Sequence, residues 1–443
     1  MSIGLGEHFT YNKLLRFVLP SIIMMIFTSI YGVIDGLFIS NFVGKTAFAA
    51  VNFIMPVTMG MSAVGFMIGA GGSALVAKTL GEGDNAKANG YFSLFLYFTI
   101  GCGIVLTVLG QIFIQPLAIV MGATADMLEP AVTYGRILMC TVTAFMVQNF
   151  FQTFFVTAEK PKLGLYVIVL AGVTNIVLDA FFVALFRWGV VGAAVATATS
   201  QLVGAVVPVA YFARKNSSLL KLGKTKWCGK AIAKAVTNGS SELLTNVSMS
   251  VVNILYNAQL LKYIGENGVA AYGMIMYVSF VFIAIFLGYS MGSAPLVGFN
   301  FGAQNKKELK NLFKKSLVVI LCACVCLVGV AFLLSHPLAQ IFVGYDAELF
   351  ALTKHAFRIY CLSFLFSGFN IFASAFFTAL NNGFISAILS FLRMFLFQIV
   401  CIYALPAIFG IEGIWFSVVV AEMLCLVVSV AFIIKNKNKY GYM

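Results

Sequence analysis

Long apolar stretches separated by short polar gaps run along the whole chain. A helix needs about 20 apolar residues to cross the roughly 30 Å hydrocarbon layer of a membrane. Stretches of that length predict six spans in the first half, at 14–40, 47–77, 91–114, 131–157, 165–186 and 189–212. After a polar, Lys-rich gap, six more are predicted at 239–262, 268–298, 316–334, 350–380, 384–408 and 411–434. The pattern predicts an all-α polytopic membrane protein with twelve transmembrane helices.

Composition supports the same class. Of 443 residues, 61% are hydrophobic and 10% are charged, whereas soluble domains carry about 25% charged residues. The nine cysteines are odd in number and lie mostly in apolar stretches, so we expect packing rather than disulfides or metal binding. The first span carries Asp35 and no small-residue cleavage site, so we expect it to stay in the mature protein.

The positions of Lys and Arg predict the orientation, because cytoplasmic loops retain them. With the N-terminus inside, twenty-one of these residues lie on the cytoplasmic side and only Lys45, Arg187 and Lys262 lie outside. We therefore expect a multi-pass protein of the cell membrane with both termini cytoplasmic. The net charge of +13 then needs no nucleic-acid partner. The basic segment from Arg214 to Lys234 is interpreted as a topogenic loop, with contact to anionic lipid head groups as the alternative.

The two halves of the chain are similar to each other. At an offset of 221 positions, identical residues coincide at Gly44 and Gly265, Ile54 and Ile275, Gly71 and Gly292, and Gly81 and Gly302. The duplication predicts an N-lobe at 1–213, a cytoplasmic Lys-rich linker at 214–238 and a C-lobe at 239–443. Six spans are an even number, so the two pseudo-symmetric six-helix lobes are related by an axis along the membrane normal, around a central cleft. That construction is typical of alternating-access carriers.

Four carboxylates fall inside predicted spans, where each costs about 2.5–3.5 kcal/mol at a helix centre and therefore indicates a functional site. They are Asp35, Asp179, Glu242 and Glu422. Glu242 lies near the Lys-rich gap, so either an interfacial position or a functional one fits it. Glu422 is interpreted either as an ion-pair partner of Arg393 or as a ligand.

Asp35 and Asp179 are the strongest candidates, because their places along the first and fifth spans put both in the outer half of the membrane. Asn175 lies four residues before Asp179 and Tyr31 four before Asp35, so each shares a helical face with its acid. Thr197 reaches a comparable depth. This all-oxygen set suits Na⁺ or a proton shared by two acids. The second half has no acids at the equivalent positions, which favours function over packing.

The chain resembles the MATE family of multidrug and toxic-compound extrusion transporters over essentially its whole length. The likeness rests on Tyr31-Gly-Val-Ile-Asp35 in the first span and Thr174-Asn175-Ile-Val-Leu-Asp179 in the fifth. It is closest to the bacterial branch of MepA-like and DinF-like proteins. The resemblance implies that H⁺ or Na⁺ couples transport at an N-lobe site formed by Asp35, Asn175, Asp179 and Thr197.

The same resemblance implies further roles for individual residues. Tyr31, Tyr134 and Gln152 match polar positions of the substrate cavity, to which we also assign Glu242. Family members often have Asn where Gln152 stands. Glu242 resembles the seventh-helix Glu of the NorM-like branch, but no Asp accompanies it in the tenth span, so we place coupling in the N-lobe. Pro20 matches a proline at which the first helix bends in some members.

The resulting hypothesis is a secondary active transporter, not an enzyme. We expect a monomer, without a cofactor, that exports lipophilic, mostly cationic compounds in exchange for H⁺ or Na⁺. One alternative is a flippase of the same superfamily that moves a lipid-linked oligosaccharide, although the intramembrane charges here are mainly acidic. The other is an intramembrane aspartyl protease that uses the Asp pair, for which duplicated lobes have no evident purpose.

Overall fold

The computed structural model describes residues 3–443, with the side chains of all but Leu37, Ser40 and Lys45, and the described part is helical without strands. The first half contains α1 (Tyr11–Phe42), α2 (Lys45–Gly81), α3 (Asn85–Val120), α4 (Ala125–Thr157), α5 (Pro161–Asp179) with the π-helical turn η1 (Ala180–Leu185), and α6 (Gly189–Ala213). The second half begins with α7 (Gly229–Tyr263), α8 (Glu266–Gly302), α9 (Lys306–Val343), α10 (Ala347–Tyr360) and the 3₁₀ turn η2 (Cys361–Ser363). It continues with α11 (Phe364–Ala379), α12 (Gly383–Phe391), the π-helical turn η3 (Leu392–Leu396), α13 (Phe397–Phe409) and α14 (Ile411–Tyr440).

These helices form the twelve rods that the apolar pattern predicts, once α5–η1, α10–η2–α11 and α12–η3–α13 are each taken as one broken rod. Within the described residues, eleven rods are long and apolar enough to cross a membrane. The remaining rod is α7, which is 35 residues long but carries Asn238, Ser240, Ser241 and Glu242 near its start. These polar side chains lower its hydropathy; Asn238 and Ser241 are buried, whereas Ser240 and Glu242 are half-buried.

The duplication is visible in the turns between helices. Gly44 precedes α2 with φ 110° and Gly265 precedes α8 with φ 82°, and both lie in the left-handed region that suits glycine. Glu159 and Asn381, 222 positions apart, each have φ 57° in the turn that follows the fourth span of their half. Equivalent turns therefore keep a positive φ, and Glu159 and Asn381 do so although their side chains differ.

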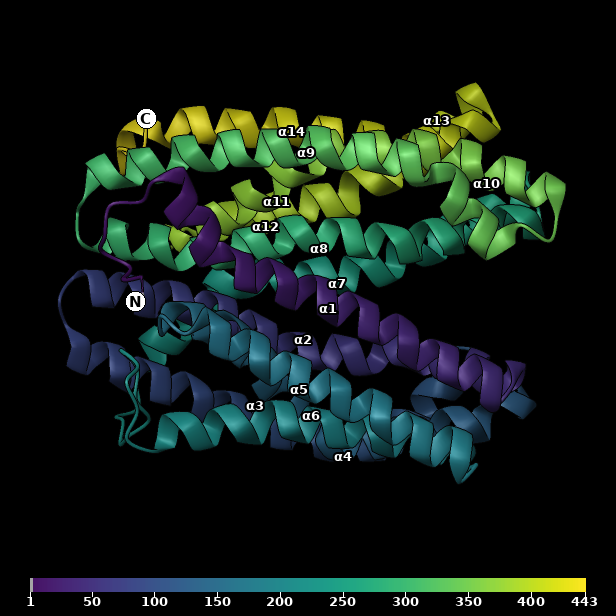
Figure 1. Cartoon of the computed structure of the whole chain (residues 1–443), viewed down its shortest axis with the longest axis horizontal. Coiled ribbons are helices and arrows are strands. Elements are labelled where there is room, and N and C mark those ends of the chain that lie inside the picture. Colours follow the sequence, from purple (N-terminus) through teal and green to yellow (C-terminus); the bar gives the residue numbers. More distant parts are fainter. Residues whose placement is uncertain (1–2) are drawn as a thin grey trace.

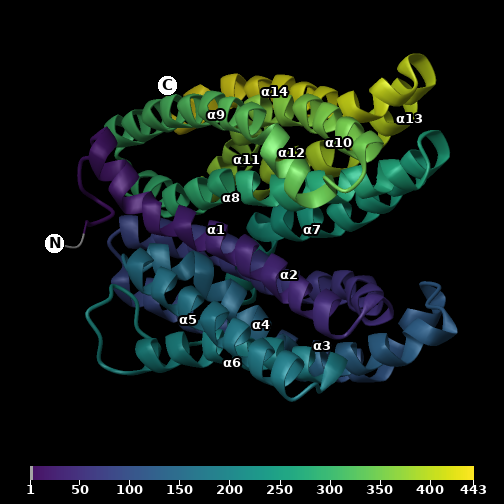
Figure 2. The same ribbon diagram turned by 45° about the vertical axis from the view of Figure 1, so that its right-hand side comes forward.

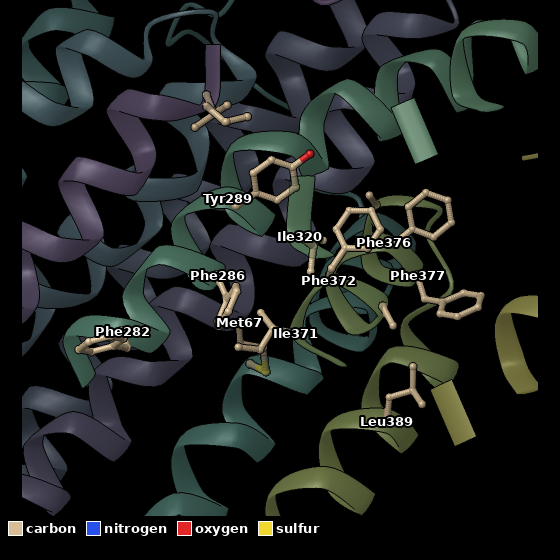
Figure 3. Packing of buried hydrophobic residues seen from close by; sticks show 14 of the residues in the cluster. Met67, Phe282, Phe286, Tyr289, Ile320, Ile371, Phe372, Phe376, Phe377 and Leu389 are labelled. Atoms are coloured by element: carbon tan, nitrogen blue, oxygen red, sulfur yellow. The ribbon is translucent and has the colours of Figure 1, made fainter. Parts of the chain in front are cut away.

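The two halves are joined near the chain termini and separate toward the other end. Both termini lie at one end, here called the terminal end, and the ribbons of the two halves diverge toward the opposite end (Figures 1 and 2). The larger buried cluster combines both halves, with Met67 of α2 beside Phe286 and Ile371 of the second half (Figure 3). A second cluster, which includes Ile39 and Tyr134, contains only residues of the first half. The structure is therefore closed at the terminal end.

Glycines allow the closest contacts between the halves. A Cβ atom on Gly71 would meet the carbonyl of Ala235 and the backbone of Gly239, where α2 crosses α7. A Cβ atom on Gly81 would meet the carbonyl of Phe299, where α2 ends beside α8. Because backbone faces backbone at both points, a side chain there would push the two halves apart.

The segment before α1 also bridges the halves at the terminal end. The Leu5 N–H donates to Glu159 Oε1 of the first half at 2.6 Å. The Phe9 N–H donates to Glu308 Oε1 of the second half at 3.0 Å, and His8 Nδ1 lies 2.6 Å from Glu308 Oε2. The buried Phe9 ring anchors the segment between these contacts. The chain start thus ties the α4–α5 turn to α9.

Candidate functional site

Two carboxylic acids lie against each other inside the first half. Asp35, on α1, is 4% exposed, and Asp179, the last residue of α5, is fully buried. The side chains of Asp179, Asn175 and Thr197 lie close enough to the Asp35 carboxyl group to act on it electrostatically. The Asn175 amide donates to Thr197 Oγ1 at 3.4 Å, which ties α5 to α6. The structure thus brings together the four residues of the expected coupling site.

Several buried polar atoms of this site have no hydrogen-bond partner in the part of the molecule that the structure describes. Five of its buried oxygens have no hydrogen-bond partner among the described residues: Asp35 Oδ1, both carboxylate oxygens of Asp179, Asn175 Oδ1 and the Tyr134 hydroxyl. Buried polar atoms are almost always paired, since an unpaired one costs about 1–3 kcal/mol. No Lys or Arg ion-pairs with either acid in the described part of the chain. The unpaired oxygens of the two acids are therefore available to a proton or another cation.

The oxygens fit a proton or a hard monovalent cation. Carboxylate, amide and hydroxyl oxygens are the ligands that such ions prefer. No group of three or more His, Cys, Asp or Glu residues gathers within the described residues, so the site lacks the ligand set of a transition metal. Alternatively, a single proton shared by Asp35 and Asp179 would satisfy one oxygen of each.

Two tyrosines extend the site. Tyr134, on α4, is fully buried, and the charge of Asp35 acts on its hydroxyl. Tyr31 lies one turn before Asp35 on α1, and its ring packs 6.1 Å from that of Phe27 and beside Gly172 of α5. Both phenols thus belong to the same region as the acids.

A break in helix geometry begins directly after Asp179. The π-helical turn η1 starts at Ala180, and the Phe186 N–H bonds back to the Phe181 carbonyl. Such turns occur often at functional sites, because the wider turn re-aims neighbouring side chains. The fifth span of the second half has a π-helical turn as well, η3, which contains Arg393.

Two predicted residues lie away from this site. Gln152 is 18 positions after Tyr134 on α4, which separates them by about 27 Å along the axis. Its side chain is buried, and its Oε1 has no partner among the described residues. Pro20 is about 22 Å before Asp35 along α1, next to Ser21, whose carbonyl is close to Gly288 of α8. Pro20 therefore lies at the contact between the halves.

The second half contains a buried charged cluster of a different kind. Arg393 Nε donates to both carboxylate oxygens of Glu422, at 2.9 and 3.1 Å. The Asn370 amide donates to Glu422 Oε2 at 2.8 Å, and Ser429 Oγ donates to Asn370 Oδ1 at 2.9 Å. The ion-pair interpretation of Glu422 is confirmed. Glu242, on α7, lies within the electrostatic range of Arg393, and no hydrogen bond to its carboxylate occurs among the described residues.

The sequence did not reveal the residues that link the halves at the terminal end. Glu308 binds the segment before α1, and Asn381 donates to the Ala74 carbonyl at 3.1 Å and accepts from the Asn238 amide at 2.7 Å. Their partners are more than a hundred positions away, so no local pattern marks them. The only available signal was the equivalence of Asn381 and Glu159 at an offset of 222.

Comparison with known proteins agrees with this architecture. The model of the MatE family matches residues 20–181 and 243–404, one segment in each half. The chain is 25% identical over 438 residues to the multidrug export protein MepA of Staphylococcus haemolyticus, which covers 98% of this chain and 95% of that protein. It is 24% identical over 420 residues to MepA of Staphylococcus aureus strain MSSA476, over 94% and 91% of the two chains.

Solved structures show the same fold. The outward-facing conformation of a multidrug resistance MATE family transporter of the MOP superfamily matches with a TM-score of 0.93 at 23% identity, over 99% of this chain and 98% of that chain. A MOP superfamily transporter from Pyrococcus furiosus, described as having reversed polarity in its binding pocket, matches with a TM-score of 0.89 at 24% identity, over 97% and 96%. The family model covers well over half of the chain, and this chain belongs to the MATE family of multidrug export transporters.

Proposed function

We propose that this transporter exports lipophilic, mostly cationic compounds in exchange for H⁺ or Na⁺, and that Asp35 and Asp179 form its coupling site. In this proposal the terminal end faces the cytoplasm, as the distribution of Lys and Arg predicts, and the protein works as a monomer without a cofactor. The MepA relatives are named as multidrug exporters, which supports drug-like cargo.

One observation carries the coupling proposal. Two buried carboxyl groups lie next to each other with no described Lys or Arg side chain paired to either. Three of their four oxygens have no hydrogen-bond partner among the described residues. Two neighbouring ionised carboxylates repel each other strongly in a medium of low dielectric constant. A proton or Na⁺ that enters between them relieves this repulsion. A bound cation therefore lowers the electrostatic free energy of this site much more than it would lower that of an exposed pair of acids.

Coupling requires that the bound ion changes the balance between conformations. An ion that binds two conformations with equal affinity does not change the equilibrium between them. The acids lie on α1 and α5, and α1 also packs along α8 of the other half. Neutralising the acids removes the repulsion between the Asp35 side chain of α1 and the Asp179 side chain of α5, so the position of α1 against α8 would respond to the ion. Loss of the negative charges also weakens the attraction for a cationic compound, which favours its release outside.

The test is transport by the purified protein in proteoliposomes loaded with a fluorescent lipophilic cation. A pH gradient and a Na⁺ gradient are applied separately. We expect one gradient to drive movement of the cation, and Asp35→Asn and Asp179→Asn to abolish that movement. Asp126→Asn, the same chemical change at an exposed acid of α4, is the matched control and should transport like the wild type.

Two results would contradict the proposal. Movement of the cation that depends on neither gradient would exclude ion coupling. Unchanged gradient-driven transport in folded Asp35→Asn and Asp179→Asn proteins would exclude the acid pair as the coupling site.

A further inference from the structure

The linker between the two halves is held in a fixed place on α3. Residues 214–228 have no regular secondary structure, yet hydrogen bonds anchor them to the first turns of that helix. The Lys221 N–H donates to Asn89 Oδ1 at 2.6 Å, and the Gly223 N–H donates to Ser93 Oγ at 3.1 Å. Other bonds join Thr225 Oγ1 to the Gly90 carbonyl at 2.7 Å and the Tyr97 hydroxyl to the Gly223 carbonyl at 3.2 Å. A loop that served only topology would not need this anchoring.

The anchored linker presents a basic and aromatic surface, here called the linker surface and made of Lys221, Lys224, Lys226 and Trp227. All four side chains are exposed, and the indole of Trp227 is 74% exposed although its ring lies 6.3 Å from that of Phe98. Among the described residues, the three ammonium groups take part in no ion pair, hydrogen bond or cation–π contact.

The acidic residues of the turn between α2 and α3 already have partners. Glu82 is 3.3 Å from Lys78 Nζ, and Asp84 accepts a hydrogen bond from the Lys87 N–H at 2.9 Å as the cap of α3. Neither ion-pairs with the linker lysines. The positive charge of the linker surface is therefore available to a partner outside the chain.

The linker surface lies at the depth of a membrane interface. The apolar run of α3 starts at Tyr91, between the two points where Asn89 and Ser93 hold the linker. Tyr97, which bonds the linker, is itself 49% exposed. Tyr and Trp are enriched where lipid head groups meet the hydrocarbon, and lysines on the cytoplasmic side attract acidic lipids.

We propose that the linker surface binds the phosphate head groups of acidic phospholipids in the cytoplasmic leaflet, with Lys221, Lys224 and Lys226 as the charged contacts and Trp227 as the interfacial anchor. The proposal shares with the proposed function only the cytoplasmic placement of the terminal end. It does not depend on the coupling ion or on the cargo. A lipid bound here would hold the linker on the first half while the second half moves.

Trp227 provides a direct readout in lipid nanodiscs. The chain has three tryptophans; Trp415 is 2% exposed and out of reach of lipid, and Trp188 is replaced by Phe. Quenching of Trp227 fluorescence is then compared for brominated phosphatidylglycerol and brominated phosphatidylcholine. We expect on the order of tenfold preference for the acidic lipid at low ionic strength, weakened by salt.

Two triple variants with the same change in charge separate the linker surface from a general charge effect. Replacement of Lys221, Lys224 and Lys226 by Gln should reduce the preference to within about twofold of none, while brominated phosphatidylcholine still quenches Trp227. Replacement of the exposed Lys435, Lys437 and Lys439 at the end of α14 by Gln should keep the preference.

Several results would overturn the proposal. These are no preference in the parent protein, an equal loss in both triple variants, and relief of quenching by soluble glycerol phosphate, which would indicate a site for free phosphate. Failure of ion-coupled transport would leave the quenching result unaffected, so the two proposals fail separately.

Discussion

Both lobes have buried charged side chains in or next to their fifth span, but only those of the second lobe form an ion pair. In the first lobe, Asp35 and Asp179 adjoin each other with orphaned oxygens and without a base. In the second lobe, Arg393 binds both oxygens of Glu422, and Asn370 fills a further hydrogen-bonding position. Both arrangements lie next to a π-helical turn of the fifth span.

This contrast supports the proposal that the acid pair of the first lobe, and not the ion pair of the second lobe, exchanges cations. A satisfied ion pair has little to gain from a passing cation, since its carboxylate already has a cationic partner and hydrogen bonds. An acid pair without a base is costly until a cation or proton arrives. The two lobes have similar helices, but only the first contains buried carboxylates without hydrogen-bond or ion-pair partners among the described residues. The contrast supports the proposal that coupling lies in the first lobe, and it favours a structural role for the Arg393–Glu422 pair.

The largest expected effect comes from breaking the ion pair of the second lobe. Arg393→Gln leaves the Glu422 carboxylate buried without its cation, which should lower the free energy of unfolding by about 3–5 kcal/mol. The double variant Arg393→Gln with Glu422→Gln removes both charges and should recover most of this loss. The measurement is the thermal unfolding midpoint of the detergent-purified protein, at one pH and one salt concentration. Equal midpoints for the single and double variants would refute the structural role.

The corresponding change in the first lobe should have a smaller effect of opposite sign. Asp179→Asn removes a carboxylate whose two oxygens have no partner in the described residues. We expect the free energy of unfolding to stay the same or to rise by about 1 kcal/mol, since a repulsive charge is lost without a broken ion pair. The same thermal midpoint checks this. A loss as large as that of Arg393→Gln would mean that both lobes use their charges structurally, and the contrast between them would disappear.

The sequence predicted the parts of this contrast that depend on local pattern. The length of the apolar stretches predicted the twelve spans, even α7, which is the one described span that is not apolar enough to stand out as a membrane helix. The spacing of four residues correctly placed Asn175 on the same helical face as Asp179, and Tyr31 on the same face as Asp35. The same helical geometry places Gln152 about 27 Å from Tyr134 along α4, so the assignment of Gln152 to the substrate cavity stays a prediction. Contacts between distant segments, such as Glu308 with Phe9, could not be predicted, because they depend on how the halves pack. The π-helical turns also have no residue signature.

The smallest effect concerns the equivalent turns at the terminal end, where Glu159 corresponds to Asn381. Burial raises the pKa of Glu159 above its usual 4.5, although the hydrogen bond from the Leu5 N–H opposes this shift. A folded-state pKa above the unfolded value means that the folded protein binds more protons, so stability should fall as the pH rises from about 4.5 through the folded pKa. Glu159→Gln keeps an acceptor for Leu5 and cannot ionise.

The variant should therefore lose a small part of the pH dependence of the thermal midpoint, worth less than about 1 kcal/mol because the side chain is only half-buried. Glu129→Gln, at an exposed acid of α4, is the control and should keep the full dependence. A steeper dependence in Glu159→Gln would mean that the Leu5 hydrogen bond, rather than burial, dominates this turn. The first lobe would then hold its turn by the charge of Glu159, while the second lobe holds the equivalent turn through the neutral amide of Asn381.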